Sequence, residues 1–374
     1  MDGDVVTEGL VATTNPTQVG ERPQSGTLLE VRDLLTHFRT HRGTVHAVDG
    51  VTFSLERGKA LGIVGESGSG KTILSRSIMG LLPRRGTQRG GEVIFEDQPI
   101  HMLSHKEMRR FWGREMAMIF QDPMSSLNPL MKIGAQIAEP LMLHLGMDRA
   151  NAWATAESLL VDVGIPEASK RVQQYPHEMS GGMRQRVMIA IALACGPTLL
   201  FADEPTTALD VTVQAQILDL LGQQRRDRNM SLVLVTHDLG VVAAHTDEIA
   251  VMYAGRIVEQ APTKVLFADM KMPYTEALMR SIPKLDLPSH SRLEAIGGRP
   301  PDLVDPPRGC RFAPRCPYAQ PRCLAEEPPL TEIGSSGHFY RCWFPVGSDV
   351  WQEVNLRRRE DPATTSATLT AGVS

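Results

Sequence analysis

The chain has 374 residues, of which 42% are hydrophobic and 22% charged, which is typical of a soluble globular protein with more than one domain. Its 39 lysines and arginines against 43 aspartates and glutamates give a net charge of −4, so electrostatics provide no reason to expect nucleic acid as a partner. No apolar run is long enough to span a bilayer, and the acidic start MDGDVV lacks a secretory pattern. We therefore expect a cytosolic protein that reaches a membrane only through a partner.

The N-terminal part predicts a tail followed by a region of strands. Residues 1–27 show no hydrophobic periodicity and are expected to be a flexible tail. Alternating apolar residues at Leu28–Leu34 and Ala47–Leu55 are typical of antiparallel strands. Ala60–Val64 is a short apolar run before a glycine, which indicates a buried parallel strand. A helix is expected after the glycines, from about Lys71 to Leu82.

The middle of the chain alternates between strand and helix patterns, with one interruption. Met116–Phe120 predicts a buried strand, and residues 122–178 then carry only helical signals, notably at Ile133–Leu145 and Ala150–Val163, which indicates a helical insertion. The alternation then resumes, with expected helices at Gly182–Ala194 and Val211–Arg226 and expected strands at Thr198–Ala202 and Leu232–Thr236. Apolar strands that alternate with helices predict an α/β fold with a parallel sheet.

The C-terminal part changes character. Ile249–Met252 and Arg256–Glu259 flank an Ala-Gly pair and predict a hairpin. Beyond Pro273, prolines recur at short intervals between Pro283 and Pro329 and exclude long helices and central strands there. We expect a separate, loop-rich region with little core, which a bound metal would help to fold. Residues 351–374 are expected to form a second flexible tail.

One segment has the pattern of a loop that binds the phosphates of a nucleotide. The segment fits G-x-x-x-x-G-K-[ST] and consists of Gly65, Glu66, Ser67, Gly68, Ser69, Gly70, Lys71 and Thr72. Its glycines allow backbone N–H groups to wrap the phosphates, while the lysine meets the β- and γ-phosphates and the threonine hydroxyl meets Mg²⁺. A glycine-rich turn of no function would not need the buried strand before it and the helix after it.

Polar residues at the ends of three further strands complete a candidate catalytic set. Asp203 and Glu204 end an apolar strand, where Asp203 is expected to hold Mg²⁺ and Glu204 to polarise the attacking water. His237 follows the next strand and is expected to contact the γ-phosphate. Gln121 follows the Met116–Phe120 strand, where its amide could touch Mg²⁺ or the water.

A second type of phosphate-binding segment lies between them. Ser180, Gly181 and Gly182 open a helix, where free N–H groups and the helix dipole favour an anion, although an ordinary helix cap has the same pattern. Because the chain already has a phosphate loop, this segment predicts a composite site shared with another subunit. Phe38 could stack on the adenine, or could belong to the core.

Together these segments resemble the ATP-binding cassette family over roughly residues 28–267. The resemblance covers the phosphate loop, the loop at Gln121, the signature at 179–183, the Asp-Glu strand, the loop Ala208-Leu209-Asp210 and His237. The family usually has Leu-Ser-Gly-Gly-Gln at the signature. Met179 and Met183 depart at its ends, while the residues that face phosphate are retained.

The resemblance implies the fold and the working assembly of that family. The expected fold is an α/β nucleotide-binding domain with a mixed sheet core, an antiparallel β subdomain and a helical subdomain at 122–178. The expected assembly is a head-to-tail dimer in which each ATP lies between the phosphate loop of one subunit and the Ser-Gly-Gly of the other. The dimer would close on ATP and open after hydrolysis, and the helical subdomain would receive a coupling helix from a membrane subunit.

Four longer segments narrow the resemblance to the ATPases of dipeptide and oligopeptide importers. They are QDPMSSLNPLMKIGAQIAEPL at Gln121–Leu141, MSGGMRQRVMIAIAL at Met179–Leu193, DEPTTALDVTVQAQIL at Asp203–Leu218 and MPYTEAL at Met272–Leu278. The last is usually His-Pro-Tyr in that family, so Met272 departs from it. The resemblance implies a C-terminal extension over residues 268–350. Nickel importers are close relatives, so nickel or another small solute is an alternative cargo.

Four of the five cysteines, Cys310, Cys316, Cys323 and Cys342, gather in this extension, whereas Cys195 lies alone in an apolar run. In a cytosolic protein such a group indicates metal binding before disulfides. The importer resemblance implies a [4Fe–4S] cluster. Zinc and no metal at all are the alternatives. Zinc sites usually use pairs with two to four intervening residues, whereas here the gaps are five, six and eighteen residues.

The resemblance thus implies an ATPase that uses ATP and Mg²⁺, the latter held at Thr72 and Gln121. It would lie at the cytoplasmic face of the cell membrane, with a second related ATPase, two permease subunits and an extracytoplasmic peptide-binding protein. One rival is a soluble cassette ATPase that acts on nucleic acid or ribosomes. Another is a non-hydrolysing regulatory or electron-transfer protein, against which Glu204 and His237 argue.

Overall fold

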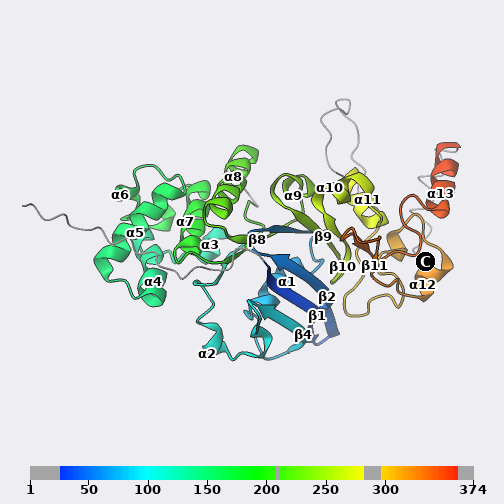
Figure 1. Cartoon of the computed structure of the whole chain (residues 1–374), viewed down its shortest axis with the longest axis horizontal. Helices are drawn as coiled ribbons and strands as arrows, with labels where there is room; N and C mark the ends of the chain where they lie inside the picture. Colours follow the sequence, from blue (N-terminus) through cyan, green and yellow to red (C-terminus); the bar gives the residue numbers. More distant parts are fainter. Residues whose placement is uncertain (1–25, 207–209, 282–295, 361–374) are drawn as a thin grey trace, which may run out of the picture.

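The computed structural model describes residues 26–206, 210–281 and 296–360, without the side chains of residues 123, 124 and 358–360. Most of the predicted N-terminal tail, the loop residues Ala208 and Leu209, and residues 361–374 of the predicted C-terminal tail lie outside these ranges. Within them, the chain forms two sheets, a helical layer at one end and a C-terminal extension at the other (Figure 1).

The larger sheet carries the strands that position the functional residues. Its order is β11-β12-β10-β9-β3-β8-β7-β6, and the five strands from β9 to β6 are parallel to one another. The strands are β3 (Ala60–Val64), β6 (Met116–Ile119), β7 (Leu199–Asp203), β8 (Ser231–Thr236), β9 (Glu248–Tyr253), β10 (Arg256–Pro262), β11 (Thr331–Glu332) and β12 (Phe339–Tyr340). The predicted parallel sheet and the terminal hairpin of β9 and β10 are confirmed.

Both faces of the parallel part are buried, which explains its continuous apolar runs. Side chains alternate between faces along a strand. In β7, Leu199 and Phe201 join one hydrophobic cluster with the antiparallel sheet, while Leu200 and Ala202 join the other cluster with the helices. The central strands are thus held between two cores, and their carboxyl ends are fixed in space.

The second sheet is antiparallel and has the order β2-β1-β4-β5. Its strands are β1 (Thr27–Thr40), β2 (Gly43–Glu56), β4 (Thr87–Phe95) and β5 (Gln98–Pro99). β1 runs beyond the predicted end at Leu34 because a bulge with Asp33 at φ +46° interrupts the apolar alternation there. The sequence did not predict β4, because the first half of this strand, TQRGG, is polar and half-exposed or exposed.

The helices of the nucleotide domain include five that follow predicted ranges and others for which the sequence gave no individual range. They are α1 (Lys71–Ile78), η1 (Ile100–Met102), α2 (His105–Met108), α3 (Pro123–Ser126), α4 (Ile133–Leu145), α5 (Arg149–Asp162), α6 (Ala168–Arg171), η2 (Pro176–Glu178), α7 (Gly181–Leu193), α8 (Val211–Asp227), α9 (Leu239–His245), α10 (Thr263–Asp269) and α11 (Pro273–Arg280). The five that follow predicted ranges are α1, α4, α5, α7 and α8. α1 ends before the predicted Leu82 because Gly80 takes φ +68°, a left-handed conformation that ends helices.

The C-terminal extension is not the separate region that its prolines predicted. Its elements are η3 (Ala313–Arg315), α12 (Pro321–Ala325), the short strands β11 and β12, and α13 (Asp349–Glu360). β12 pairs with β10 at the edge of the larger sheet, and Phe312 is buried in the core that the sheet shares with the helices. The extension therefore shares the hydrophobic core of the nucleotide domain.

The prediction of a flexible tail from residue 351 is wrong for its first part, because residues 351–360 belong to the helix α13. α13 lies at the far end of the extension (Figure 1), and its Trp351 Nε1 donates to Glu276 Oε1 of α11 at 3.2 Å. Asn355 Nδ2 adds a contact of 3.4 Å to the hydroxyl of Tyr318. These side-chain contacts anchor a helix whose polar sequence alone gave no sign of docking.

Candidate active site

The phosphate loop, residues 65–72, links β3 to α1 and depends on glycine at two points. Gly65 and Gly70 have φ values of +155° and +104°. A Cβ on Gly65 would lie 2.1 Å from Met252 O, and one on Gly70 would lie 2.2 Å from Ala47 O. Both backbones approach neighbouring strands so closely that any side chain would displace them.

Lys71 lies buried inside this loop. Its Nζ donates to Gly65 O at 2.8 Å and to Glu66 O at 3.0 Å. Burial lowers the pKa of Lys71, which means that the structure disfavours its charged form. Glu66, Asp203 and Glu204 already favour the charged form, and an anion in the loop, such as the triphosphate of a nucleotide, would favour it further.

Thr72 and Asp203 meet beside the loop, as the sequence predicted for a magnesium site. Thr72 Oγ1 donates to Asp203 Oδ1 at 2.9 Å. Asp203 is fully buried, burial raises its pKa, and its Oδ2 has no hydrogen-bond partner among the described residues. A hydroxyl and a buried carboxylate with a spare oxygen form a donor set that suits Mg²⁺.

Glu204 joins two other predicted residues at the carboxyl ends of neighbouring strands. Gln121 Nε2 donates to Glu204 Oε2 at 2.8 Å, and His237 Nδ1 lies 3.6 Å from Glu204 Oε1. The backbone of Glu204 has φ +46°, which costs roughly 1–3 kcal/mol in a non-glycine residue. Strain of this kind is typical of functional positions, and here it holds the carboxylate between an amide and an imidazole.

The signature residues lie in the helical layer and not in this chain's phosphate loop. Ser180 is the N-cap of α7, and its Oγ accepts from Met183 N at 3.4 Å. Ser180 and Gly181 are exposed, whereas Met179 is buried and Met183 packs against the core. Of the two methionines that depart from the usual signature, Met179 is therefore a core residue and Met183 packs at the edge of the core, with an exposed helix N-terminus between them.

The two remaining residues predicted to act at the nucleotide site, Phe38 and Asp210, have ordinary positions on a strand and at a helix cap. Phe38 is half-buried on β1, where it pairs with Val45 of β2 and Thr87 of β4. Asp210 is the exposed N-cap of α8, and its Oδ1 accepts from Val213 N at 2.9 Å. The structure assigns a capping role to Asp210 and leaves the role of Phe38 as a prediction.

The four clustered cysteines converge on one pocket although they span 33 positions, from Cys310 to Cys342. All four line a pocket with about 10 Å³ of free space, together with apolar side chains that include Phe312, Trp343 and Phe344. Burial raises the pKa of Cys310, of Cys342 and of Cys316, the last to about 12. These thiols are therefore protonated at neutral pH unless a cation replaces the proton.

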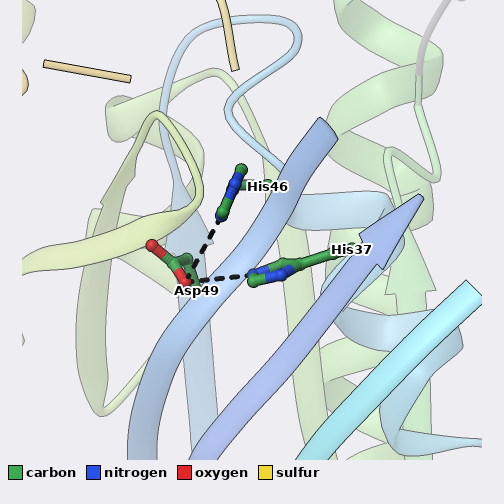
Figure 2. A group of neighbouring side chains, drawn as sticks. All are labelled: His37, His46 and Asp49. Atoms are coloured by element: carbon green, nitrogen blue, oxygen red, sulfur yellow. Dashed lines mark hydrogen bonds and ion pairs between the residues drawn. The ribbon is translucent and has the colours of Figure 1, made fainter. Parts of the chain in front are cut away.

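A group that the sequence reading missed lies on the antiparallel sheet (Figure 2). His37 Nε2 is 3.0 Å from Asp49 Oδ1, and His46 Nδ1 is 3.9 Å from the same oxygen. Among the described residues, it is the one trio of potential metal ligands whose atoms all lie within 4.8 Å of one another. The three residues come together only because β1 pairs with β2, in a register that places His37 opposite His46.

Asp49 acts mainly as a counter-charge for two arginines, which argues against a cation there. Its Oδ2 accepts from Arg256 Nη2 at 2.9 Å and from Arg311 Nη2. Burial by itself would raise the pKa of Asp49, but the hydrogen bonds and charges of these arginines lower it to about 2. A divalent ion at this trio would face both guanidinium groups.

Comparisons with known proteins agree with this geometry. The family model described as ABC transporter matches residues 48–207, and the model described as oligopeptide/dipeptide transporter, C-terminal region, matches residues 258–323. The oligopeptide transport ATP-binding protein OppD of Bacillus subtilis is 50% identical over 84% of this chain and 88% of its own length. The dipeptide transport ATP-binding protein DppD of Bacillus subtilis is 48% identical over 84% of this chain and 94% of its own length.

Solved structures share the fold of the nucleotide domain. A dimeric ATP-binding cassette in a post-hydrolysis state with ADP and phosphate matches with a TM-score of 0.58 and 25% identity, over 63% of this chain and 99% of that one. The cbiO1 protein of Clostridium perfringens, described as part of the ABC transporter complex cbiONQ, matches with a TM-score of 0.54 and 26% identity, over 65% of this chain and 91% of that one.

The fold and the nucleotide site together define an ATPase of the ATP-binding cassette class. The chain belongs to the ABC transporter family, in the branch that carries the oligopeptide/dipeptide transporter C-terminal region. None of the helices in the described part of the chain is long and apolar enough to cross a membrane.

Proposed function

We propose that this protein is the ATP-hydrolysing subunit of an importer for dipeptides or oligopeptides and acts at the cytoplasmic face of the membrane. The observation that carries the ATPase part is the meeting of Gln121, Glu204 and His237 next to the Thr72–Asp203 pair. The peptide cargo is supported by relatives named as oligopeptide and dipeptide transport proteins.

In the proposed reaction, Glu204 orients and deprotonates the water that attacks the γ-phosphate. Gln121 and His237 hold its carboxylate in place through contacts of 2.8 Å and 3.6 Å. Lys71 and the N–H groups of residues 65–72 bind the phosphates. Thr72 and Asp203 would hold Mg²⁺, which when bound neutralises charge on the phosphates.

The arrangement of α7 supports a composite ATP site shared with a partner subunit. Ser180, Gly181 and Gly182 start an exposed helix N-terminus in the helical layer, and a helix N-terminus attracts phosphate. We propose that this segment completes the ATP site of a second, related ATPase in a head-to-tail pair. Two permease subunits and an extracytoplasmic peptide-binding protein would complete the transporter.

We further propose that Cys310, Cys316, Cys323 and Cys342 hold a metal centre, with a [4Fe–4S] cluster favoured over zinc. Four thiols around one pocket suit either centre. Zinc with sulfur ligands at about 2.3 Å would place the sulfurs about 3.8 Å apart. In the described part of the chain, no three of these thiols lie within 4.8 Å of one another, so a zinc site would need them to move together.

The free space in the pocket, about 10 Å³, is room for a single ion. A cluster would therefore require the half-buried Trp343 and Phe344 to shift outward. Anaerobic purification with metal analysis decides between the two centres. About four irons per chain that disappear in Cys316→Ser would support the cluster, whereas one zinc or no metal would contradict it.

Transport itself is tested with the assembled transporter in vesicles. We expect ATP-dependent uptake of labelled di- to pentapeptides, and no uptake when Glu204→Gln replaces the wild-type chain. Uptake of nickel without peptide would overturn the peptide assignment and favour the alternative cargo. Co-purification with RNA in place of permeases would instead favour the soluble class of cassette ATPase.

A further inference from the structure

The C-terminal extension reaches directly into the phosphate loop at Glu66. Arg315 Nη1 contacts Glu66 Oε2 at 2.6 Å, and Arg315 Nη2 contacts Glu66 Oε1 at 2.9 Å, a bidentate pair between residues 249 positions apart. The Arg315 side chain is only 3% exposed and that of Glu66 27%. Buried bidentate pairs of this geometry are among the stronger charge-assisted contacts in proteins.

Every N–H group of the Arg315 guanidinium has an acceptor. Besides Glu66, Nε donates to Gly297 O at 2.8 Å, Nη2 to Ile296 O at 3.2 Å and Nη1 to the Tyr253 hydroxyl at 3.2 Å. Five donors in a planar fork are thus satisfied at once. Such a network fixes the position of the guanidinium and, through it, the carboxylate of Glu66.

The backbone of Glu66 is held by a residue of α11. Glu66 N donates to the hydroxyl of Tyr274 at 2.8 Å, and Tyr274 is fully buried on α11. The rings of Tyr253, Tyr274 and Phe312 pack together, with centroids 4.5–5.3 Å apart. Tyr274 therefore fixes the backbone N–H of Glu66, and Arg315 fixes its carboxylate.

The loop that carries Arg315 begins and ends at two of the clustered cysteines. Arg315 closes the 3₁₀ turn η3 and directly precedes Cys316. Ala313 N donates to Cys310 O at 3.0 Å, Cys316 N to Ala313 O at 3.2 Å, and Cys310 N to Cys323 O at 2.8 Å. A centre bound to these thiols would fix both ends of the turn and hence the base of the Arg315 side chain.

We propose that Arg315 and Tyr274 are positioning residues for the phosphate loop, and that a filled cysteine centre raises the affinity for ATP by holding Arg315 on Glu66. This inference rests on the proposed function, because it takes residues 65–72 as the ATP site and the thiols as a metal centre. Arg315 cancels a carboxylate that would otherwise repel the phosphates, and Tyr274 fixes the loop backbone at the same residue.

The first experiment separates this charge effect from a merely structural role. The dissociation constant for ATP is measured by calorimetry on the full chain for wild type, Arg315→Ala, Glu66→Gln and the double variant. We expect about a tenfold weaker ATP binding for Arg315→Ala, since an uncompensated charge near another is worth on the order of 1 kcal/mol or more. The double variant should bind within about twofold of wild type, because its repelling carboxylate is gone.

Unchanged binding by Arg315→Ala would overturn the proposal, and so would a double variant as weak as Arg315→Ala. Arg42→Ala is the matched control, because it breaks an exposed 2.6 Å pair with Asp302 in the same extension without contact to residues 65–72. Arg315→Lys and Tyr274→Phe keep the proposal testable if Arg315→Ala fails to fold. Each should weaken ATP binding severalfold, and wild-type binding by both would contradict the proposal.

The second experiment tests the link to the cysteines. We expect Cys316→Ser to lose its metal, to bind ATP about as weakly as Arg315→Ala, and to show no additional loss when the two changes are combined. Hydrogen exchange over residues 64–72 should accelerate in both variants. A metal-free Cys316→Ser that binds ATP like wild type overturns the link, and a wild-type chain without metal does so as well. In either case the comparison of Arg315→Ala, Glu66→Gln and the double variant still tests whether Arg315 offsets the charge of Glu66.

Discussion

At the scale of single residues, Glu204 is the side chain that we propose activates water for hydrolysis. It lies at the end of β7 with a left-handed backbone, φ +46°, between Gln121 Nε2 and the ring of His237. The side chain is 14% exposed, so its carboxylate is shielded from bulk water but open to the site. A neutral amide of the same size would keep these contacts and lose the basicity.

We predict that Glu204→Gln lowers the rate of ATP hydrolysis by about 10²–10⁴-fold, the range in which a general base contributes. ATP binding should be retained, because the phosphates are bound by residues 65–72 and not by Glu204. Steady-state phosphate release and ATP calorimetry on the same preparation measure the two effects. A variant that loses both in parallel would instead have lost the shape of the site.

At the scale of elements, we propose that the N-terminus of α7 acts on the ATP of another subunit. Ser180 caps this helix and is exposed, at the edge of a layer made by α3, α4, α5 and α7. We predict that Ser180→Arg leaves ATP binding at this chain's own loop unchanged and abolishes hydrolysis in the assembled transporter. ATP affinity of the isolated chain and phosphate release by the assembly are the measurements.

Ser169→Arg is the matched control for that substitution, since Ser169 is an exposed serine on α6 of the same helical layer. It should leave both quantities near their wild-type values. Transport and hydrolysis that survive Ser180→Arg would show that the signature does not act on a partner's ATP.

The contact between the antiparallel sheet and the extension predicts that the stability of the folded chain depends on pH. Asp49 of β2 bonds Arg256 and Arg311, and its pKa in the folded chain is about 2, below the ordinary 3.8. A lowered folded pKa stabilises the fold above the unfolded pKa, and the benefit is lost as the pH falls from about 4 to about 2. Asp49→Asn should therefore lower the Tm at pH 7, and the gap to wild type should narrow below pH 4.

Thermal unfolding between pH 7 and pH 3 measures this gap. Asp302→Asn is the control, because its pair with Arg42 is exposed on both sides and contributes little in water. A gap between wild type and Asp49→Asn that does not change with pH would mean that the carboxylate charge contributes nothing beyond its shape.

At the scale of the whole molecule, the extension and the nucleotide domain are expected to unfold together. β12 adds to the sheet beside β10, and Phe312 packs on Tyr253 of β9, so the two parts share one core. We predict that Cys316→Ser lowers the Tm by several degrees yet keeps a single transition, since the metal centre that we propose for these thiols would stabilise the chain that holds it.

Differential scanning calorimetry checks the number of transitions. Cys195→Ser is the control, because Cys195 lies outside the extension, in the turn after α7, where its Sγ donates to Pro140 O at 3.4 Å. Two transitions in Cys316→Ser, the first of them confined to residues 296–360 by proteolysis, would show that the extension folds independently after all.

Much of the architecture could be predicted from the chain because it follows from local pattern. Apolar runs such as Ala60–Val64 and Leu199–Asp203 predict buried parallel strands, and a polar residue directly after such a strand must lie at one edge of the sheet. This rule alone brings Gln121, Glu204 and His237 together. The glycines at Gly65 and Gly70 mark close backbone approaches that no other residue permits.

The sequence by itself therefore determined the nucleotide motifs, the parallel sheet, the helical insertion and the family to which the chain belongs. Only the tertiary structure decided that Arg315 and Tyr274 grip Glu66, that Arg311 reaches Asp49, and that α13 docks where a tail was expected. The physical reason is range, because periodicity and turn chemistry act over a few residues. Single contacts across 200 or more positions, such as 208 and 249 for Glu66 with Tyr274 and Arg315, leave no local pattern and depend on how the extension packs.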